Sequence, residues 1–80
     1  MRLDKFLKVS RVIKRRPVAN EACDNGRVSI NGKIAKASTD VKIGDIVEIK
    51  FGDKIVKFEV TGISEIATKQ SAENMVKLLD

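Results

Sequence analysis

The hydrophobic pattern of this chain changes its period once, close to residue 26, and this change restricts the folds open to it. Over residues 3–14, buried-type side chains recur at spacings of three and four, as on one face of an α-helix. From Arg27 onward, apolar and polar residues alternate, which is typical of half-buried β-strands. A chain that is helical first and extended afterwards predicts an α+β domain.

The first predicted helix has two distinct faces. One face, expected to join the core, carries Leu3, Phe6, Leu7, Ser10 and Ile13. A second face carries Asp4, Lys8, Arg11 and Arg15, within about 60° of each other on the helical wheel. Asp4 lies one turn before Lys8, so an ion pair between these two side chains is expected.

A second helix is expected after Arg16-Pro17, because the residue before a proline is pushed out of the α region. Pro17 suits the first position of that helix, and Asn25-Gly26 suits a left-handed stop. Its predicted apolar stripe consists of Val18, Ala19, Ala22 and Cys23. The join between the helices then projects Lys14, Arg15 and Arg16 outward as a basic corner.

The remaining chain predicts two hairpins and a short tail. Asn31-Gly32 separates apolar alternation on both sides, which is the strongest short hairpin signal, and Gly52-Asp53 separates a second pair of strands. After a polar connection over residues 36–42, the strands of that pair alternate through Phe51 and Val60. Ser71 is expected to cap a final short helix. Its apolar residues are Met75, Leu78 and Leu79.

We therefore predict two N-terminal helices packed on a small antiparallel sheet, with a short C-terminal helix. The chain has 80 residues, one Cys and no His, so neither an internal disulfide nor a metal site is expected. No apolar run approaches the ~20 residues that a membrane span needs, which favours a cytoplasmic protein. No cofactor is expected. Cys23 is expected to be buried and unreactive, and no catalytic group stands out. An enzyme is not expected.

The positive charge gathers at one end of the chain. There are 16 Lys and Arg residues against 11 Asp and Glu residues, a net charge of +5. Residues 1–16 alone hold seven bases and one acid, whereas residues 17–40 sum to zero and residues 41–80 to −1. This asymmetry favours a polyanionic partner over a merely solvated helix face.

The aromatic content narrows the kind of nucleic acid. The chain contains Phe6, Phe51 and Phe58 and no Trp or Tyr, and all three fall on apolar stripes where a core position is expected. Without a stacking platform, recognition should depend on phosphates and shape, which favours folded RNA over a single strand. Around the first hairpin, Arg27, Lys33 and Lys36 suit RNA contact as well as a solvated strand edge, and Asn31 also suits plain turn chemistry.

Several motifs together resemble the RNA-binding module named after small-subunit ribosomal protein S-four, also called the alpha-L motif. The resemblance covers residues 2 to about 50. The matching residues are Arg2-Leu3-Asp4-Lys5-Phe6-Leu7, Ser10-Arg11, Lys14-Arg15-Arg16, Ala19, Gly26-Arg27-Val28-Ser29-Ile30-Asn31-Gly32 and Gly44-Asp45. A free-standing module of this length is most similar to RqcP-like ribosome-quality-control factors, and otherwise to the heat-shock factor that binds large ribosomal subunits.

The resemblance implies a function and a partner set. It implies a monomeric RNA-binding factor that binds tRNA and rRNA on the stalled large subunit. That factor would stabilise P-site peptidyl-tRNA while an RqcH-like partner adds C-terminal alanine tails. Residues 1–67 would form the RNA-binding domain and residues 68–80 a tail. The RNA-contact residues expected from charge and resemblance together are Arg2, Asp4, Lys5, Lys8, Arg11, Lys14, Arg15, Arg16, Arg27, Asn31, Lys33 and Lys36.

Two points of the pattern stay open. Asp4 is an acid within a phosphate-binding face, and we expect it to orient Lys8 or Arg11. At Lys36-Ala37-Ser38 the chain lacks a proline that often precedes the serine in the family, which leaves the path of this loop open. A DNA-binding helix-turn-helix regulator is the competing function of another class, and a protein that docks an acidic partner is a third.

Overall fold

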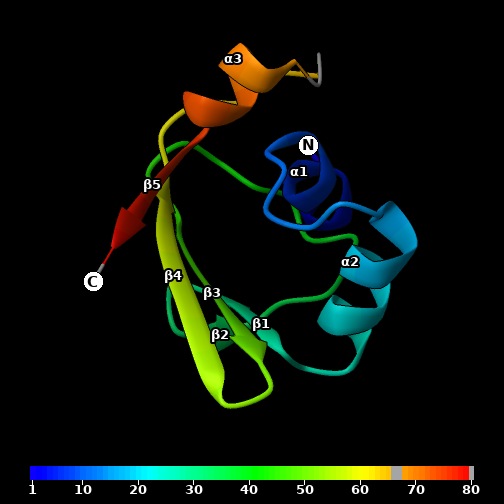
Figure 1. Ribbon diagram of the computed structural model, residues 1–80. Coiled ribbons are helices and arrows are strands. Elements are labelled where there is room, and N and C mark those ends of the chain that lie inside the picture. Colours follow the sequence, from blue (N-terminus) through cyan, green and yellow to red (C-terminus); the bar gives the residue numbers. More distant parts are fainter. Residues whose placement is uncertain (66–67, 80) are drawn as a thin grey trace.

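The computed structural model describes residues 1–65 and 68–79. It contains three helices and one five-stranded antiparallel sheet of strand order β2-β1-β3-β4-β5. The elements in chain order are α1 (Leu3–Val9), α2 (Arg16–Asp24), β1 (Val28–Ile30), β2 (Lys33–Ile34), β3 (Ile46–Phe51), β4 (Lys54–Val60), α3 (Lys69–Glu73) and β5 (Val76–Leu79). Figure 1 shows α1 and α2 on the same face of the sheet. The α+β prediction is confirmed.

The core lies between the two N-terminal helices and the sheet. Leu3, Phe6 and Leu7 of α1 are completely buried, and the Phe6 ring stacks on Phe58 of β4 with centroids 6.3 Å apart. Ser10 and Ile13 are also buried, so the whole predicted stripe is confirmed. Burial of this apolar surface is the main force that packs the helices on the sheet.

The first helix is shorter than the sequence pattern predicts. Helix α1 ends at Val9, not near residue 14, and Arg11 adopts a left-handed conformation with φ 63°. The Arg11 N–H then bonds the Lys8 carbonyl, and the Ile13 N–H reaches the Leu7 carbonyl, both at 3.0 Å. Because this turn folds Ile13 back onto the core, the apolar stripe continues although the helix does not.

Helix α2 begins and ends close to the predicted residues. Pro17 occupies its first turn, and Gly26 follows its end with φ 73°. The Gly26 and Arg27 N–H groups bond the carbonyls of Cys23 and Ala22, the pattern of a Schellman motif. Of the predicted stripe, Ala19, Ala22 and Cys23 are buried, whereas Val18 is 49 % exposed because it lies on the side of the helix turned away from α1.

The sheet confirms both hairpins and corrects the tail. In the first hairpin Ile30 pairs with Lys33, and in the second Phe51 pairs with Lys54. Helix α3 is capped by Thr68, with Ser71 as its reciprocal partner rather than as the cap itself. Residues 76–79 form strand β5 beside β4. The prediction that the final helix includes Leu78 and Leu79 was therefore wrong. Met75 lies in the core and is only 1 % exposed. Pairing of β5 with β4 satisfies backbone groups at the edge of β4, which would lack these partners if residues 76–79 continued the helix.

The loop between the first hairpin and β3 returns to the start of α1. The Asp4 N–H bonds the Ala37 carbonyl and the Leu3 N–H bonds the Thr39 carbonyl. Ala37 is buried, so the loop packs against the domain at this position although it lacks the proline that often precedes the serine. No helix in the described part of the chain is long and apolar enough to cross a membrane.

Candidate RNA-binding surface

Asp4 is a buried carboxylate that gathers two arginines and an asparagine. Its side chain is only 3 % exposed, although it lies in the first turn of α1. Arg2 Nε donates to Oδ1 at 3.2 Å, Arg16 Nε donates to Oδ2 at 3.4 Å, and Asn20 Nδ2 donates to Oδ2 at 3.2 Å. The Lys5 backbone N–H completes the set at 2.8 Å. We call Arg2, Asp4, Arg16 and Asn20 the Asp4 cluster.

The expected partners of Asp4 were wrong. No hydrogen bond or ion pair joins Asp4 to Lys8 or Arg11 in the described parts of the chain, and the pairing with Lys8 is replaced by Arg2 and Arg16. The reason is the early end of α1, which lets α2 pack against it and bring Arg16 to the start of the first helix. Asp4 therefore points between the two helices and not along an outer basic face.

The surroundings of Asp4 keep its carboxylate charged. Burial alone would raise its pKa, because a low-dielectric environment disfavours the charged form. Hydrogen bonds from Asn20, the Lys5 N–H and Arg16, together with the Arg16 charge, outweigh this effect and hold the pKa below its ordinary value of 3.8. Asp4 is therefore an anion at neutral pH and a fixed anchor for guanidinium groups.

The two anchored arginines keep most of their donors for a partner. The Arg2 side chain remains 52 % exposed, and the Arg16 side chain remains 45 % exposed. A guanidinium has five N–H donors in a planar fork, and Asp4 occupies only one or two of them in each case. Beside them lies a cavity of about 390 Å³ lined by Asp4, Arg16, Pro17 and Asn20. This arrangement presents two oriented guanidiniums, which suits phosphate groups.

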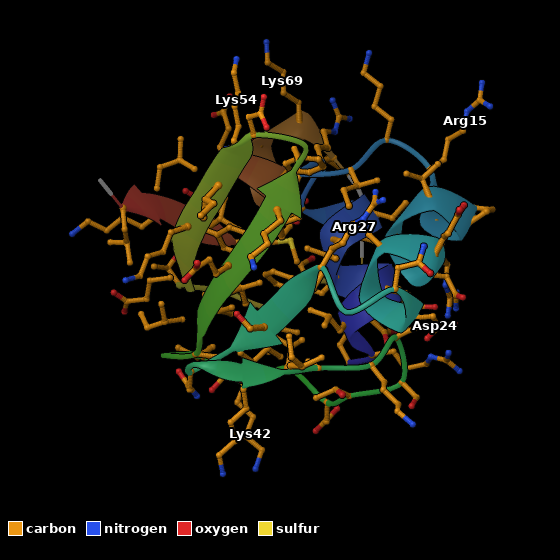
Figure 2. The ribbon with its side chains drawn as sticks, turned by 90° about the horizontal axis from the view of Figure 1, so that it is seen from below. Arg15, Asp24, Arg27, Lys42, Lys54 and Lys69 are labelled. Atoms are coloured by element: carbon orange, nitrogen blue, oxygen red, sulfur yellow. The ribbon has the colours of Figure 1, made fainter. Side chains whose placement is uncertain are left out.

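Most of the other predicted basic residues lie in the same N-terminal stretch of the chain as this cluster. Lys8, Arg11, Lys14 and Arg15 are all exposed on α1 and on the corner that follows it. Figure 2 shows Arg15 pointing away from that corner. Lys5 is partly covered, and its Nζ lies 3.4 Å from a carboxylate oxygen of Glu65. We call the seven bases of this region the basic face: Arg2, Lys5, Lys8, Arg11, Lys14, Arg15 and Arg16.

The hairpin residues are placed differently. Asn31 has φ 53°, accepts the Ile46 N–H at 2.9 Å and donates to Asp45 at 3.1 Å, so its side chain fastens the first hairpin to β3. Lys36 adjoins Ala37, whose carbonyl bonds the Asp4 N–H, so it lies near the start of α1. Lys33 is exposed on β2. Arg27 lies at the far end of α2, between that helix and the sheet (Figure 2), and is not part of the Asp4 cluster.

One member of the cluster was missed in the sequence. Asn20 lies four residues after Arg16, so both side chains share one face of α2. That spacing was a usable signal, but only the contact with Asp4 from another helix gives it meaning. By contrast, Cys23 is buried as predicted. Burial, with the nearby negative charges of Asp4 and Asp24, raises the pKa of its thiol to about 11, so it is not a nucleophile at neutral pH.

Comparison with known proteins identifies the family of this chain. Residues 1–47, which include α1, α2 and the first hairpin, match the S4 domain. The chain is 54 % identical over 79 residues to the RQC P-site tRNA stabilizing factor of Bacillus subtilis, covering 99 % of this chain and 92 % of that protein. It is 49 % identical over 79 residues to the factor of the same name in Streptococcus pneumoniae, covering 99 % and 90 %. The chain belongs to the RQC P-site tRNA stabilizing factor family.

This S4-domain family shares its fold with a heat-shock protein. A solved structure of Vibrio cholerae Heat Shock Protein 15, described as trimeric, has a TM-score of 0.90 and 29 % sequence identity to this chain. The match covers 99 % of this chain and 81 % of that protein. In this member of the RQC factor family, every predicted contact residue falls inside the 47 matched residues, whereas β3, β4 and β5 extend largely beyond them.

Proposed function

We propose that this chain is an RNA-binding factor of ribosome-associated quality control. In this role it binds tRNA and rRNA on the stalled large ribosomal subunit and stabilises P-site peptidyl-tRNA. The observation that carries the proposal is the Asp4 cluster, in which a buried carboxylate orients Arg2 and Arg16, two members of the basic face. The names of the relatives at about half identity support the same role.

Phosphate and shape recognition is the proposed mechanism on this face. Phe6 and Phe58 are fully buried, so neither offers a ring to a base there. Seven bases spread over α1 and the corner can neutralise several phosphates at once and release their counterions. A factor with such a face can bridge two folded RNAs, which is what holding tRNA against large-subunit rRNA requires.

The finer elements of the proposal concern the cellular setting. We place the factor in the cytoplasm as a non-catalytic monomer that acts while an RqcH-like partner adds alanine tails. Residues 1–67 serve as the RNA-binding domain in this proposal, and residues 68–80 as its tail. The heat-shock-type function is the alternative that the Vibrio cholerae structure supports, at lower sequence identity. The S4 match favours RNA over the DNA-binding helix-turn-helix alternative.

Charge reversal at the cluster tests the proposal. In Arg16→Glu, the new carboxylate faces Asp4 and repels phosphate, so we expect binding to isolated large subunits carrying P-site tRNA to fall below detection in co-sedimentation. Lys77→Glu, which makes the same change in net charge on the exposed part of β5, should bind like the parent chain.

Three controls give this test its meaning. Urea unfolding must show that Arg16→Glu remains folded. Ribonuclease treatment of the bound fraction should release the chain, whereas a factor docked on an acidic protein would stay attached. Equal sedimentation of both variants would contradict the proposal, and a preference for duplex DNA in a competition gel would favour the helix-turn-helix alternative.

A further inference from the structure

A second surface feature lies between α2 and the end of β3. A groove of about 160 Å³ is lined there by three apolar and three charged residues. Phe51, expected in the core, is instead 40 % exposed, because it follows the last buried residue of β3 at the end of the sheet. We call this the α2–β3 groove, formed by Val18, Glu21, Ala22, Arg27, Lys50 and Phe51.

The groove faces away from the Asp4 cluster. Arg16 and Asn20 share one side of α2, and Val18 and Ala22 share another. At 3.6 residues per turn, Arg16 and Val18 are about 200° apart around the helix axis. Helix α2 therefore separates two surfaces, and a ligand in the groove does not compete with one on the cluster.

Two of the residues that line the groove carry like charges and are joined by a backbone hydrogen bond. The Lys50 N–H bonds the Arg27 carbonyl at 2.9 Å, directly beyond the pairing of Val28 with Ile49, so the two bases are opposite each other on neighbouring strands. Like charges in this arrangement repel. No carboxylate in residues 1–65 and 68–79 forms an ion pair with either one. The Schellman turn at the end of α2 holds Arg27 in place, so an anion bound between the two side chains would relieve the repulsion.

We propose that the α2–β3 groove is a second RNA subsite, which takes one unstacked nucleobase on the Phe51 ring and its phosphate between Arg27 and Lys50. The inference rests on the proposed RNA-binding function and adds a base contact that the basic face lacks. Val18 borders the same groove and supplies apolar contact for the base.

The one acid in the groove fits this orientation. Glu21 would repel a phosphate, so the phosphate belongs at the side of Arg27 and Lys50. A carboxylate facing the base edge accepts hydrogen bonds from an amino group, as carboxylates do with cytosine. The subsite should therefore prefer a base that carries an exocyclic amino group over uracil. The presence of both charge signs fits a nucleotide better than it fits an isolated anion.

The first arm of the test measures affinity for large subunits carrying P-site tRNA. Phe51→Leu keeps the apolar bulk but removes the ring, and we expect the Kd to rise about tenfold, the order lost with one base–aromatic stack. Phe51→Tyr should retain affinity within about twofold, since its ring also stacks. Ile55→Ala removes another exposed apolar side chain of the same hairpin, outside the groove, and should leave the Kd unchanged.

The second arm locates the base. Ultraviolet irradiation of the complex, followed by ribonuclease and trypsin, should leave a single-nucleotide adduct on the peptide of residues 51–54, which trypsin releases after Lys50 and Lys54. This adduct should be missing from Phe51→Leu. An unchanged Kd for Phe51→Leu, or an adduct confined to peptides of the basic face, would overturn the inference.

The outcomes separate this inference from the proposed function. If Arg16→Glu loses binding while Phe51→Leu binds like the parent chain, the function stands and the subsite falls. If Arg16→Glu binds normally, the proposed function fails first. A Phe51→Leu defect that persists toward subunits stripped of tRNA and treated with ribonuclease would assign the groove to a protein and overturn the RNA subsite.

Discussion

At the scale of single residues, Asp4 connects the stability of the fold with the proposed RNA-binding surface. It is the acid most deeply buried among those the structure describes, and its partners come from the chain before α1 and from α2. A buried carboxylate is tolerated only when it is well hydrogen-bonded, and here four donor residues satisfy it. The contacts that offset the cost of burying the Asp4 carboxylate also orient the guanidiniums of Arg2 and Arg16.

Replacing Asp4 by Asn should weaken both properties. The amide nitrogen of Asp4→Asn would face donors from Arg2, Arg16 or Asn20, so we expect a loss of roughly 1–3 kcal/mol in the free energy of unfolding at neutral pH. RNA affinity should fall as well, because the arginines lose their anchor. Urea unfolding and large-subunit co-sedimentation measure the two effects. The exposed acid of α3 offers a matched control in Glu73→Gln, which should change neither.

The pH dependence of this difference follows from the pKa of Asp4. Because the folded-state pKa lies below the ordinary 3.8, the charged form stabilises the fold fully above that pH. The stabilisation is lost as the pH falls through the folded-state value. The stability gap between the parent chain and Asp4→Asn should therefore narrow below pH 3.8. A gap that is constant or widens toward acid would contradict the assignment.

At the scale of elements, the end of α1 carries an arginine where glycine is usually found. Arg11 occupies the left-handed position just after the helix cap, at φ 63°. A side chain with a Cβ is strained there, yet the position aims an exposed base outward beside the corner. Such a residue is typical of a site where binding outweighs stability.

Substitution of Arg11 by glycine should separate stability from binding. Arg11→Gly removes the Cβ strain and should raise the free energy of unfolding by up to about 1 kcal/mol. It should also lower large-subunit affinity, because one phosphate contact is lost. Arg11→Lys keeps both the charge and the strain and should match the parent chain in stability. A chain made less stable by Arg11→Gly would show that the Arg11 side chain itself supports the fold.

At the scale of the whole molecule, the net charge of +5 averages two unlike parts. The first 16 residues hold +6, and these bases lie on and just before α1, on the corner that follows it and at the start of α2. An RNA-binding surface of this kind acts through many phosphates together, so salt should compete strongly with binding.

The salt dependence of large-subunit binding measures the number of phosphates contacted. Each contact should contribute roughly 0.7–0.9 to the slope of log affinity against log salt concentration. With seven bases on the basic face, we expect a slope well above two in magnitude. A slope below about two would indicate that the basic face does not carry the binding.

The local elements were readable from the sequence, because their signals act over a few residues. Apolar periodicity predicted the buried stripe of α1, Pro17 and Gly26 marked the bounds of α2, and Asn31-Gly32 marked the first hairpin. The concentration of bases in residues 1–16 likewise predicted the basic face and a polyanionic partner. The match of residues 1–47 to the S4 domain agrees with the family resemblance of these motifs.

Contacts between distant residues were decided only by the tertiary structure. A helical wheel assigned Asp4 to Lys8, but a turn at Arg11 shortens α1 and packing of α2 delivers Arg16 instead. Residues 76–79 read as a helix end, yet the free edge of β4 makes them a strand. Phe51 alternates like a core residue, but the core ends before it. Each case depends on which neighbour is available, and periodicity within one segment carries no information about that.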